Sequence, residues 1–550
     1  MTTSESKINL VCLSNAGDTI DWDIGKCFNC PPEPKALLDF IESHLVSHPA
    51  DGWLFWDPGL GTPDGDYLLA KLSGSADVWH AGLKLGLSGQ PKIIDYVQPI
   101  WMLNRDPNLV IEASSWRLSL RACLIRAEIL KQLGGPDPNF ATLAWAGLEL
   151  GFRYIRKGVF IRHDPNLVIK EIRGETIKIP LQDQLRFLRA GFDHRWRLWA
   201  GFRAIISGEE NLVDLHRAGQ KIRDDDPLPG KNPYRHEIEK VAIDNENQRV
   251  SVLIPTLRRY PYLRMLLGQL RTQTVEPYEI IIVDQTPSEF RDQELLYDFS
   301  DLPLRYFTLD QAGQCSSRNL GLQKAVGDFI LFIDDDDEVP SDLIEKHLQT
   351  LHQFQINISN GVAHEVGTGK LPEDYRLMRI SSVFPTNNTM IRRDVLQKSG
   401  LFDLAYDHGQ RADHDLGMRL YLSGELMVLN PEISVFHHHA PMGGLREHKA
   451  RVKTRAASRQ HLFRQNLPTV SDIYLAKRYF SQTQVREILW INLLGTFSIQ
   501  GGIFKRLTKV LISLLILPHS LWVLTTRSLA ADDMLKHYPR IPELETEEKT

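Results

Sequence analysis

The 550-residue sequence has little cysteine and no large excess of either charge. Its five cysteines are too few and too scattered for a disulfide framework, and the one CxxC pair, Cys27 with Cys30, has no second pair that would complete a zinc site. A formal net charge of -5 argues against the basic surface typical of nucleic-acid-binding proteins. We therefore expect a protein of a reducing compartment with no nucleic-acid partner.

A secretory signal is also lacking, because the first 15 residues, MTTSESKINLVCLSN, contain no basic stretch followed by a long apolar run. A cytoplasmic location is therefore expected. Near the C-terminus, two uncharged runs, Ile488–Phe504 and Val510–Thr526, flank the basic residues Lys505, Arg506 and Lys509. Each run has about 17 residues, at the short limit for a spanning helix. Buried helices, a true span and a peripheral anchor on the cytosolic face of a membrane all stay open.

Four apolar segments after residue 250 have the composition of buried strands and alternate with segments of helical spacing. The strand segments are Ser251–Thr256, Glu279–Asp284, Leu304–Leu309 and Asp328–Asp334. This alternation predicts an α/β fold with a mostly parallel, Rossmann-like sheet. Polar residues end these strands, and ligands of such sheets gather beyond the carboxyl ends of the strands.

The first half of the chain repeats parts of the second. Asp51–Pro63 resembles Asp328–Pro340, since both run from an aspartate through an apolar strand to another aspartate and then a proline. Leu124–Asp137 aligns with Met390–Asp403, and the ungapped alignment continues to Pro165, with eleven identities at one constant offset. We interpret the chain as two copies of one fold.

The two copies differ where chemistry is expected. Asp57 matches Asp334, but residues 58–60 are Pro, Gly and Leu where the second copy has three more aspartates. Gly147 stands at the position of Asp413. Only 56 residues precede Asp57, whereas about 85 residues of the second copy precede Asp334, so a whole βα unit is missing from the first copy. The first copy is predicted to be degenerate and non-catalytic.

Four consecutive aspartates, Asp334 to Asp337, follow the last predicted strand. Carboxylate oxygens are the ligands that Mg²⁺ and Mn²⁺ prefer, and such ions bridge to phosphates when one or two carboxylates hold them. Asp334 and Asp336, one residue apart, can reach one ion. The alternative is an acidic turn that caps the helix expected after Pro340, although a cap needs only one such side chain.

Residues 249–445 resemble a glycosyltransferase family 2 catalytic domain, which has the GT-A fold. The family's motifs occur in order as LIPTLRR (253–259), IIIVDQTP (280–287), QAGQCSSRNLGLQKAVGDFILFIDDDDEVP (311–340), NNTMIRRDVLQKSGLFD (387–403) and RADHDLGMRLYLSGE (411–425). The resemblance implies an inverting transfer of a sugar from a nucleotide donor. It implies that Thr256 and Asp284 line the nucleoside pocket, with Asp284 as the partner of the base, and that Pro255 and Arg258 also bind the nucleotide sugar.

The resemblance implies further roles in the second copy. Arg318 and Asn319 would lie near the nucleotide, Asp334 would approach the ribose or the metal, and Asp336 would ligate Mn²⁺ or Mg²⁺ beneath the diphosphate. His437 or His439 would complete the metal shell, although a histidine triplet at a strand end is also common as plain surface.

The resemblance places the catalytic base at Asp413. Ala412 replaces the glutamate usual in the family's EDxDLxxR motif, which keeps Asp415 as a second candidate base. Asp413 alternatively serves only as a charge at a helix N-terminus. Arg446 would meet the diphosphate when a glycine-containing loop closes, or is a plain surface charge.

We expect tandem GT-A-like domains and a C-terminal helical region: a degenerate copy (1–207), a linker (208–248), a catalytic domain (249–445) and helices (446–550). The expected function is metal-dependent transfer of a sugar from a UDP-, dTDP- or GDP-linked donor to a hydroxyl of a glycan or lipid-linked acceptor, in surface glycan assembly. One alternative is a sugar-nucleotide nucleotidyltransferase, although LIPTLRRYPYL lacks the glycines of its phosphate loop. The other is a non-catalytic glycan-binding or scaffold protein.

Overall fold

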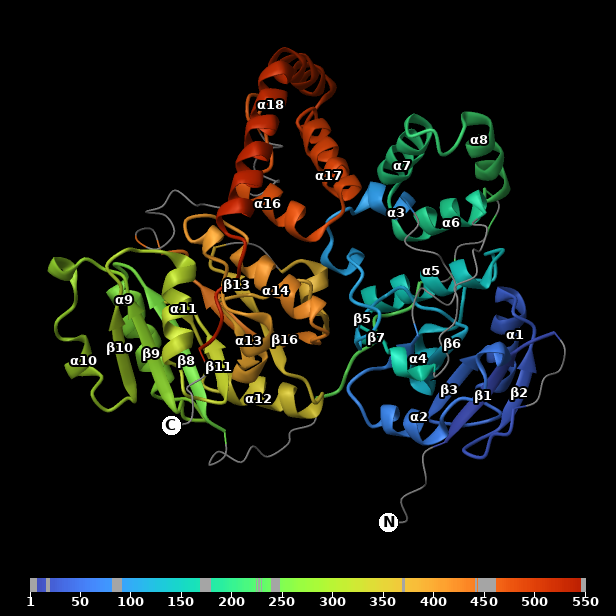
Figure 1. Ribbon diagram of the computed structural model, residues 1–550, viewed down its shortest axis with the longest axis horizontal. Helices are drawn as coiled ribbons and strands as arrows, with labels where there is room; N and C mark the ends of the chain where they lie inside the picture. Colours follow the sequence, from blue (N-terminus) through green and yellow to red (C-terminus); the bar gives the residue numbers. More distant parts are fainter. Residues whose placement is uncertain are drawn as a thin grey trace.

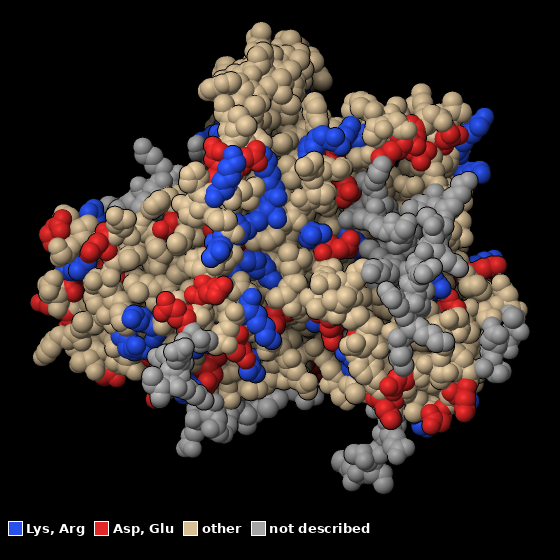
Figure 2. Space-filling model, in the orientation of Figure 1, with Lys and Arg blue, Asp and Glu red and all other residues tan. Residues whose placement is uncertain are grey.

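The computed structural model describes residues 7–15, 20–81, 92–168, 180–223, 225, 228, 230–238, 248–367, 371–440, 443 and 461–545. They form two sheets with flanking helices, followed by C-terminal helices that project from the body (Figure 1). Acidic and basic side chains are intermixed over the body of the face seen in Figure 2. The expected α/β class, with two mixed and largely parallel sheets, is confirmed.

The first sheet has seven strands in the order β2-β1-β3-β6-β4-β7-β5. Its strands are β1 (Ile8–Leu13), β2 (Cys27–Cys30), β3 (Gly52–Trp56), β4 (Val78–His80), β5 (Ala113–Ser114), β6 (Ala122–Arg126) and β7 (Ile161–His163). The helices of this half are α1 (Pro34–His44), α2 (Gly65–Leu72), α3 (Lys92–Val97), α4 (Ala127–Leu133), α5 (Leu143–Arg156), α6 (Leu181–Gly191), α7 (His194–Ile206) and α8 (Leu212–Lys221). Helix α8 lies inside the segment predicted as a linker.

The second sheet has the order β10-β9-β8-β11-β15-β13-β16-β12, with β14 also on β16. Its strands are β8 (Val250–Thr256), β9 (Glu279–Asp284), β10 (Leu304–Thr308), β11 (Phe329–Phe332), β12 (Asp337–Glu338), β13 (Ile358–Glu365), β14 (Arg379–Ile380), β15 (Thr389–Arg392) and β16 (Met427–His437). The helices are α9 (Tyr260–Leu270), α10 (Leu295–Asp298), α11 (Gln314–Lys324), α12 (Leu343–Gln353), α13 (Arg393–Ser399), α14 (Ala412–Leu422), α16 (Val470–Tyr479), α17 (Gln482–Gly495) and α18 (Ile503–His537).

The two sheets share one strand order and one set of pairing directions. β3 pairs with β6 antiparallel as β11 pairs with β15, and β4 pairs with β7 parallel as β13 pairs with β16. The second sheet continues past β9 to β10, whereas the first ends at β2. In the described part of the first copy, no helix separates β1 from β2, at the place that α9 occupies between β8 and β9. The repeat therefore extends to the topology, and the shortening of the first copy falls where the sequence predicts it.

An arginine network is also common to both copies. Arg153 in α5 and Arg419 in α14 each bind an acid four residues earlier and two carbonyls at the C-terminal end of the preceding helix, one from its last residue and one from two residues later. The partners are Glu149, Leu133 and Gly135 in the first copy, and Asp415, Ser399 and Leu401 in the second. Because the first copy keeps this network without the expected base, the network holds α5 and α14 in place rather than serving chemistry.

Candidate active site at the strand ends of the second sheet

The four aspartates form a tight turn directly after β11. Asp337 N donates to Asp334 O at 3.2 Å, and Asp334 N donates to an Asp337 carboxylate oxygen at 3.1 Å. The N-cap of α12 is Asp342, so the aspartate turn does not cap that helix. The turn instead directs neighbouring carboxylates toward different partners.

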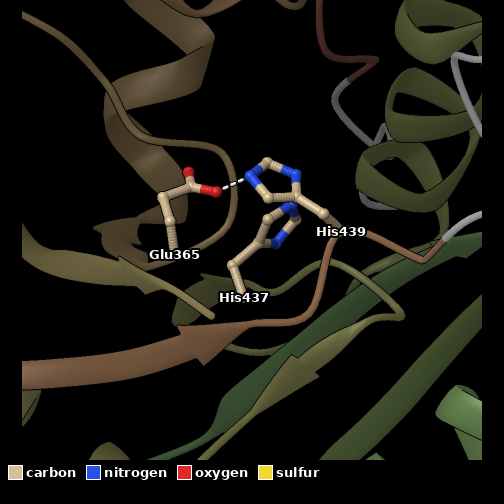
Figure 3. Close-up of side chains that lie close together, drawn as sticks. All are labelled: Glu365, His437 and His439. Atoms are coloured by element: carbon tan, nitrogen blue, oxygen red, sulfur yellow. Dashed lines mark ion pairs between the residues drawn. The ribbon is translucent and has the colours of Figure 1, made fainter. Parts of the chain in front are cut away.

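A carboxylate and two imidazoles gather beside this turn (Figure 3). Ligand atoms of Glu365, His437 and His439 all lie within 4.8 Å of one another, and His439 Nε2 forms an ion pair with Glu365. The parallel register of β13 and β16 pairs Glu365 with His437. The chemical types of this donor set suit a divalent transition-metal ion. Sequence reasoning missed Glu365, which its place at the end of β13 could have indicated.

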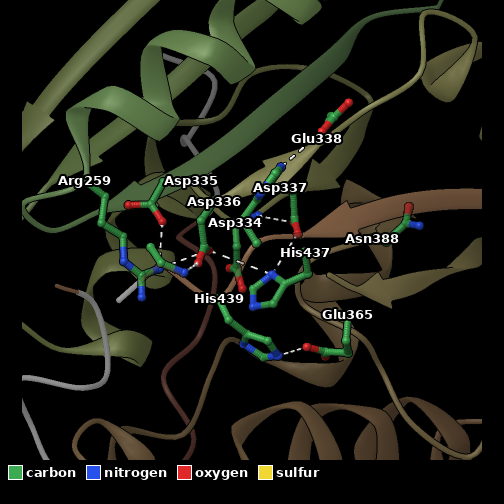
Figure 4. A network of polar contacts seen from close by, with 12 residues as sticks. Arg259, Asp334, Asp335, Asp336, Asp337, Glu338, Glu365, Asn388, His437 and His439 are labelled. Carbon is green, nitrogen blue, oxygen red and sulfur yellow. Dashed lines mark hydrogen bonds and ion pairs between the residues drawn. The ribbon is translucent and has the colours of Figure 1, made fainter. Parts of the chain in front are cut away.

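Every carboxylate of the turn lies against a polar or cationic side chain, and Asp335 and Asp336 share Arg259 (Figure 4). Thr256 Oγ1 donates to Asp335 at 2.7 Å, and Arg318 Nη2 donates to Asp334 at 2.8 Å. Asp337 Oδ1 lies 2.9 Å from His437 Nδ1. Arg259 Nη1 lies 3.0 Å from Asp336 Oδ1 and also 3.0 Å from Asp335 Oδ1. His437 therefore joins the aspartate turn to the Glu365–His439 pair.

One carboxylate oxygen of Asp336 accepts no hydrogen bond in this network. Its side chain is fully buried, and Oδ2 accepts from Ala440 N at 2.8 Å. Oδ1 has no hydrogen-bond donor; the nearby cationic groups are Arg259, at 3.0 Å, and His437 Nδ1, at 3.8 Å. An unsatisfied buried carboxylate oxygen is costly unless a cation binds it. Through His437, Asp336 adjoins the cluster of Glu365, His437 and His439, whose donor atoms fit the expected metal site.

The electrostatics of the turn reflect burial and mutual repulsion. Burial raises the pKa of Asp335 to about 7, with a further increase from Asp336, although Arg259 and Thr256 act in the opposite direction. Burial also raises the pKa of Asp337. Burial lowers the pKa of His437, but the surrounding carboxylates outweigh it and raise that pKa overall. This concentration of negative charge favours a bound cation.

The pKa of Asp335 gives a testable pH dependence. Between its ordinary value, 3.8, and about 7, the folded protein retains a proton that the unfolded chain has released, so this group makes stability fall as pH rises through that window. We expect Asp335→Asn to reduce the change in the free energy of unfolding across this pH window by about 1–3 kcal/mol. Thermal unfolding at pH 4 to 8 in the presence of a chelator measures it, and parallel curves for the two proteins would contradict it.

Asp284 lies at the end of β9 with both carboxylate oxygens engaged. The hydroxyls of Tyr260 and Tyr306 donate to Oδ2, and Thr286 N donates to Oδ1 at 2.8 Å. A base that hydrogen-bonds Asp284 would therefore compete with a tyrosine hydroxyl. Both tyrosines were missed by sequence reasoning, because their convergence on one carboxylate depends on the fold.

The other residues expected at the nucleotide have different surroundings. Pro255 is half-buried at the end of β8, and the exposed Arg258 guanidinium lies 4.7 Å from the centre of the Phe290 ring. Asn319 binds the backbone N–H and carbonyl of Phe402, both at 2.8 Å, so it anchors α11 rather than approaching the aspartate turn. Arg446 lies outside the described residues.

The contacts of the two candidate bases differ. Asp415 is fully buried, and its oxygens accept from Arg419 Nε at 3.0 Å and Tyr479 OH at 2.7 Å. The side chain of Asp413 is 35% exposed and is 2.9 Å from His414 Nδ1. Burial opposes its ionisation, but His414 and Arg411 lower its pKa to about 2. The geometry favours Asp413 as the group that can meet an acceptor.

Helix α11 connects Asp413 to the aspartate turn. At its N-terminus, Gln314 Nε2 donates to the carbonyls of Tyr406 and Gly409, which immediately precede α14. One turn later, Arg318 binds Asp334. The loop that leads to the candidate base and the turn that leads to the candidate metal site are therefore fixed to the same end of one helix.

Backbone strain is concentrated in the same region. Four described residues other than glycine have positive φ, and three of them, Arg258, Arg411 and His439, belong to the candidate site or adjoin its members. Such conformations are unfavourable for residues with a side chain and are found preferentially at functional sites.

In the first copy, the aspartate at the corresponding position, Asp57, is neutralised by an arginine of the same domain. Asp57 Oδ2 is 2.8 Å from Arg121 Nε and 2.7 Å from Arg121 Nη2. The constant offset of the repeat puts Asn387 at the position of Arg121 in the second copy. A protein guanidinium thus pairs with the single aspartate, and position 147 is glycine, in agreement with the predicted loss of catalysis.

Part of the second copy is similar in sequence to known glycosyltransferases. The family model described as Glycosyl transferase family 2 matches residues 251–409. The uncharacterized glycosyltransferase YwdF of Bacillus subtilis is 31% identical over 168 residues, which cover 28% of this chain and 62% of YwdF. Glycosyltransferase GlyA of Streptococcus pneumoniae is 28% identical over 117 residues, covering 21% of this chain and 17% of GlyA. The chain therefore spans less than two thirds of these curated relatives.

Two solved structures are similar at a lower level. S. aureus TarS 1–349, in complex with UDP-GlcNAc, has 16% identity and a TM-score of 0.34, covering 53% of this chain and 82% of that one. The mannosyltransferase PcManGT from Pyrobaculum calidifontis, in complex with GDP-Man and Mn²⁺, has 16% identity and a TM-score of 0.34, covering 55% and 90%.

Proposed function

Residues 251–409 form a glycosyltransferase family 2 domain, and on this premise we propose that the protein transfers a sugar from a nucleotide-sugar donor to a hydroxyl acceptor. The donor is a UDP-, dTDP- or GDP-linked sugar, in keeping with the motifs of the second copy. The reaction proceeds with inversion at the anomeric carbon, and the first copy takes no part in the chemistry.

The observation that carries the proposal is the buried Asp336 Oδ1, which has no hydrogen-bond donor and lies 3.8 Å from His437 Nδ1, whose ring packs against that of His439. Asp336, His437 and His439 would hold Mn²⁺ or Mg²⁺, with Asp334 close by. When bound, this ion stabilises the negative charge of the departing diphosphate. Arg259 and Arg318, already held at the aspartate turn, contribute positive charge to the same region.

Asp413 acts as the general base. Its low pKa keeps it ionised at neutral pH, so that it can accept the proton of the acceptor hydroxyl. The acceptor oxygen forms the new bond to the anomeric carbon, the bond from that carbon to the diphosphate oxygen breaks, and the nucleoside diphosphate leaves with the bonding electrons. One displacement of this kind inverts the configuration.

The acceptor is a glycan or a lipid-linked glycan at the cytosolic face of a membrane. Support for this location comes from the long apolar helix α18, which α16 connects to the candidate base. Arg411 binds Asp472 at 2.6 Å, Tyr479 binds Asp415 at 2.7 Å, and α16 packs along α18.

A panel of nucleotide sugars, incubated with the full-length protein and mixed glycan acceptors, tests this function. We expect metal-dependent release of a nucleoside diphosphate with formation of a glycosylated product, identified by mass spectrometry. Release of pyrophosphate from a nucleoside triphosphate and a sugar phosphate would instead indicate a nucleotidyltransferase. Glycan binding without turnover of any donor would indicate a scaffold.

A further inference from the structure

Helices α17 and α18 form a hairpin that projects from the body of the protein (Figure 1). Many of its apolar side chains face outward, with Leu515 82% and Trp522 63% exposed. The other large apolar side chains exposed on these two helices are Trp490, Leu494, Ile503, Phe504, Leu507, Val510, Leu511, Leu514, Leu521 and Leu529. Continuous exposed apolar surface of this kind marks a contact with a partner or a membrane.

Residues 488–531, which make up most of the hairpin, carry charge of only one sign. No acidic residue occurs between Glu487 and Asp532, whereas Lys505, Arg506, Lys509 and Arg527 fall in that interval. The tip seen in Figure 2 shows neither acidic nor basic side chains. An apolar tip on a segment with only positive charge matches a surface of anionic lipid better than a protein surface of mixed charge.

The contacts of α18 favour insertion into one leaflet over a crossing. An 18-residue segment of α18 has a mean hydropathy of 1.8, and only 22% of that segment is buried inside the protein. Its length and composition alone would therefore permit a membrane span. However, Lys509 Nζ donates to the carbonyls of Leu462 and Arg464, and Arg527 Nη1 donates to that of Pro468. Non-helical backbone therefore runs beside α18 from Lys509 to Arg527. Such backbone is not tolerated in contact with hydrocarbon, so this side of α18 stays against the protein and only the opposite, exposed apolar side enters the leaflet.

A second exposed apolar face lies on α7, in the half of the chain that belongs to the first copy. Leu198, Phe202 and Ile206 recur at helical spacing and are all exposed, Leu198 by 72%. Figure 1 shows α7 and α8 on the same side of the molecule as the hairpin.

A buried ion pair fixes α7 to the hairpin. Arg203 Nε and Nη2 lie 2.7 and 2.5 Å from the two carboxylate oxygens of Glu487 in α17, whose side chain is fully buried. Bidentate pairs of this type fix orientation as well as distance. The faces of α7 and of the hairpin are thus held on one platform.

We propose that the hairpin and α7 together form a docking surface for anionic phospholipid bilayers, with the hairpin inserted into the near leaflet and Leu198, Phe202 and Ile206 resting on the same interface. Two separate points of contact, one from the C-terminal helices and one from the first copy, fix the tilt of the protein on the membrane. The degenerate first copy thereby acquires a role that needs no catalytic residue.

Flotation of the full-length protein with vesicles tests the surface without reference to enzymatic activity or nucleotide binding. We expect flotation with vesicles of phosphatidylglycerol and phosphatidylcholine, and less with phosphatidylcholine alone. Leu515→Ser with Trp522→Ser should lower the partition more than tenfold, and Leu198→Ser with Phe202→Ser by about fivefold to tenfold, since each removes two exposed apolar contacts. Point substitutions are required because residues after α18 bind the second copy, with Leu401 N donating to Pro542 O.

Leu296→Ser with Tyr297→Ser, two exposed apolar residues of α10, serves as the matched control and should float like the wild type. Equal flotation of the α7 variant and the wild type would overturn the two-point surface. The proposal would also be overturned if the wild-type protein floated with neither kind of vesicle and light scattering showed a dimer that both variants lose. A second copy of the chain would then cover this face instead.

Discussion

Asp413→Asn is expected to reduce the rate of sugar transfer by about 10²–10⁴-fold, the range for loss of a positioned general base. The amide cannot accept the proton of the acceptor hydroxyl. Donor binding should be retained, because the residues expected to hold the donor lie elsewhere, at the aspartate turn and in the nucleoside pocket. Steady-state transfer with a saturating donor measures the first effect, and calorimetric titration with the donor nucleotide measures the second.

Asp415→Asn is the control for this prediction. It weakens the contacts of Asp415 with Arg419 and Tyr479, so it should lower the midpoint of thermal unfolding. For the protein that stays folded, Asp415→Asn should reduce the transfer rate much less than Asp413→Asn does. Assignment of the base to Asp413 would be wrong if Asp415→Asn abolished transfer at an unchanged unfolding midpoint while Asp413→Asn remained active.

Asp336→Asn should lower transfer by about 10²–10³-fold, as loss of one preorganised electrostatic contact to the developing charge does in other enzymes. Unlike Asp413→Asn, it should also remove the metal dependence of nucleotide binding, because a neutral amide is a poor ligand for a hard cation. Transfer and binding are measured across a series of Mn²⁺ concentrations.

Asp342→Asn provides a matched acidic control for this variant, since Asp342 follows the turn by a few residues, pairs with Lys346 and is 39% exposed. It should leave both transfer and metal-dependent binding unchanged. Equal loss in the two variants would mean that general negative charge, and not a ligand at position 336, is what matters.

The sequence predicted the candidate site best where its polar residues stand at the ends of parallel strands. Polar residues at the ends of β8, β9 and β11 are brought to one edge of the sheet, as parallel strands require. Strand β11 is shorter than expected, because the aspartate turn begins directly after Ile333. The repeat was visible in eleven identities, and its strand order follows in the structure.

What the sequence could not supply are contacts between distant segments. Arg259 belongs to a recognised motif, yet its ion pairs with Asp335 and Asp336 depend on how α9 packs against β12. Glu365 enters the site only through the register of β13 with β16. The choice between Asp413 and Asp415 had a signal in the repeat, since Glu149 keeps an acid at the position of Asp415 in the copy without a base.

A crystal soaked with Mn²⁺ and a nucleoside diphosphate would test the central claim most directly, through the anomalous scattering of the ion. One peak is predicted at coordination distance, about 2–2.3 Å, from Asp336 and from His437 or His439, with the diphosphate on its other side. A bound nucleotide without such a peak, or an ion held by other residues away from the diphosphate, would contradict it.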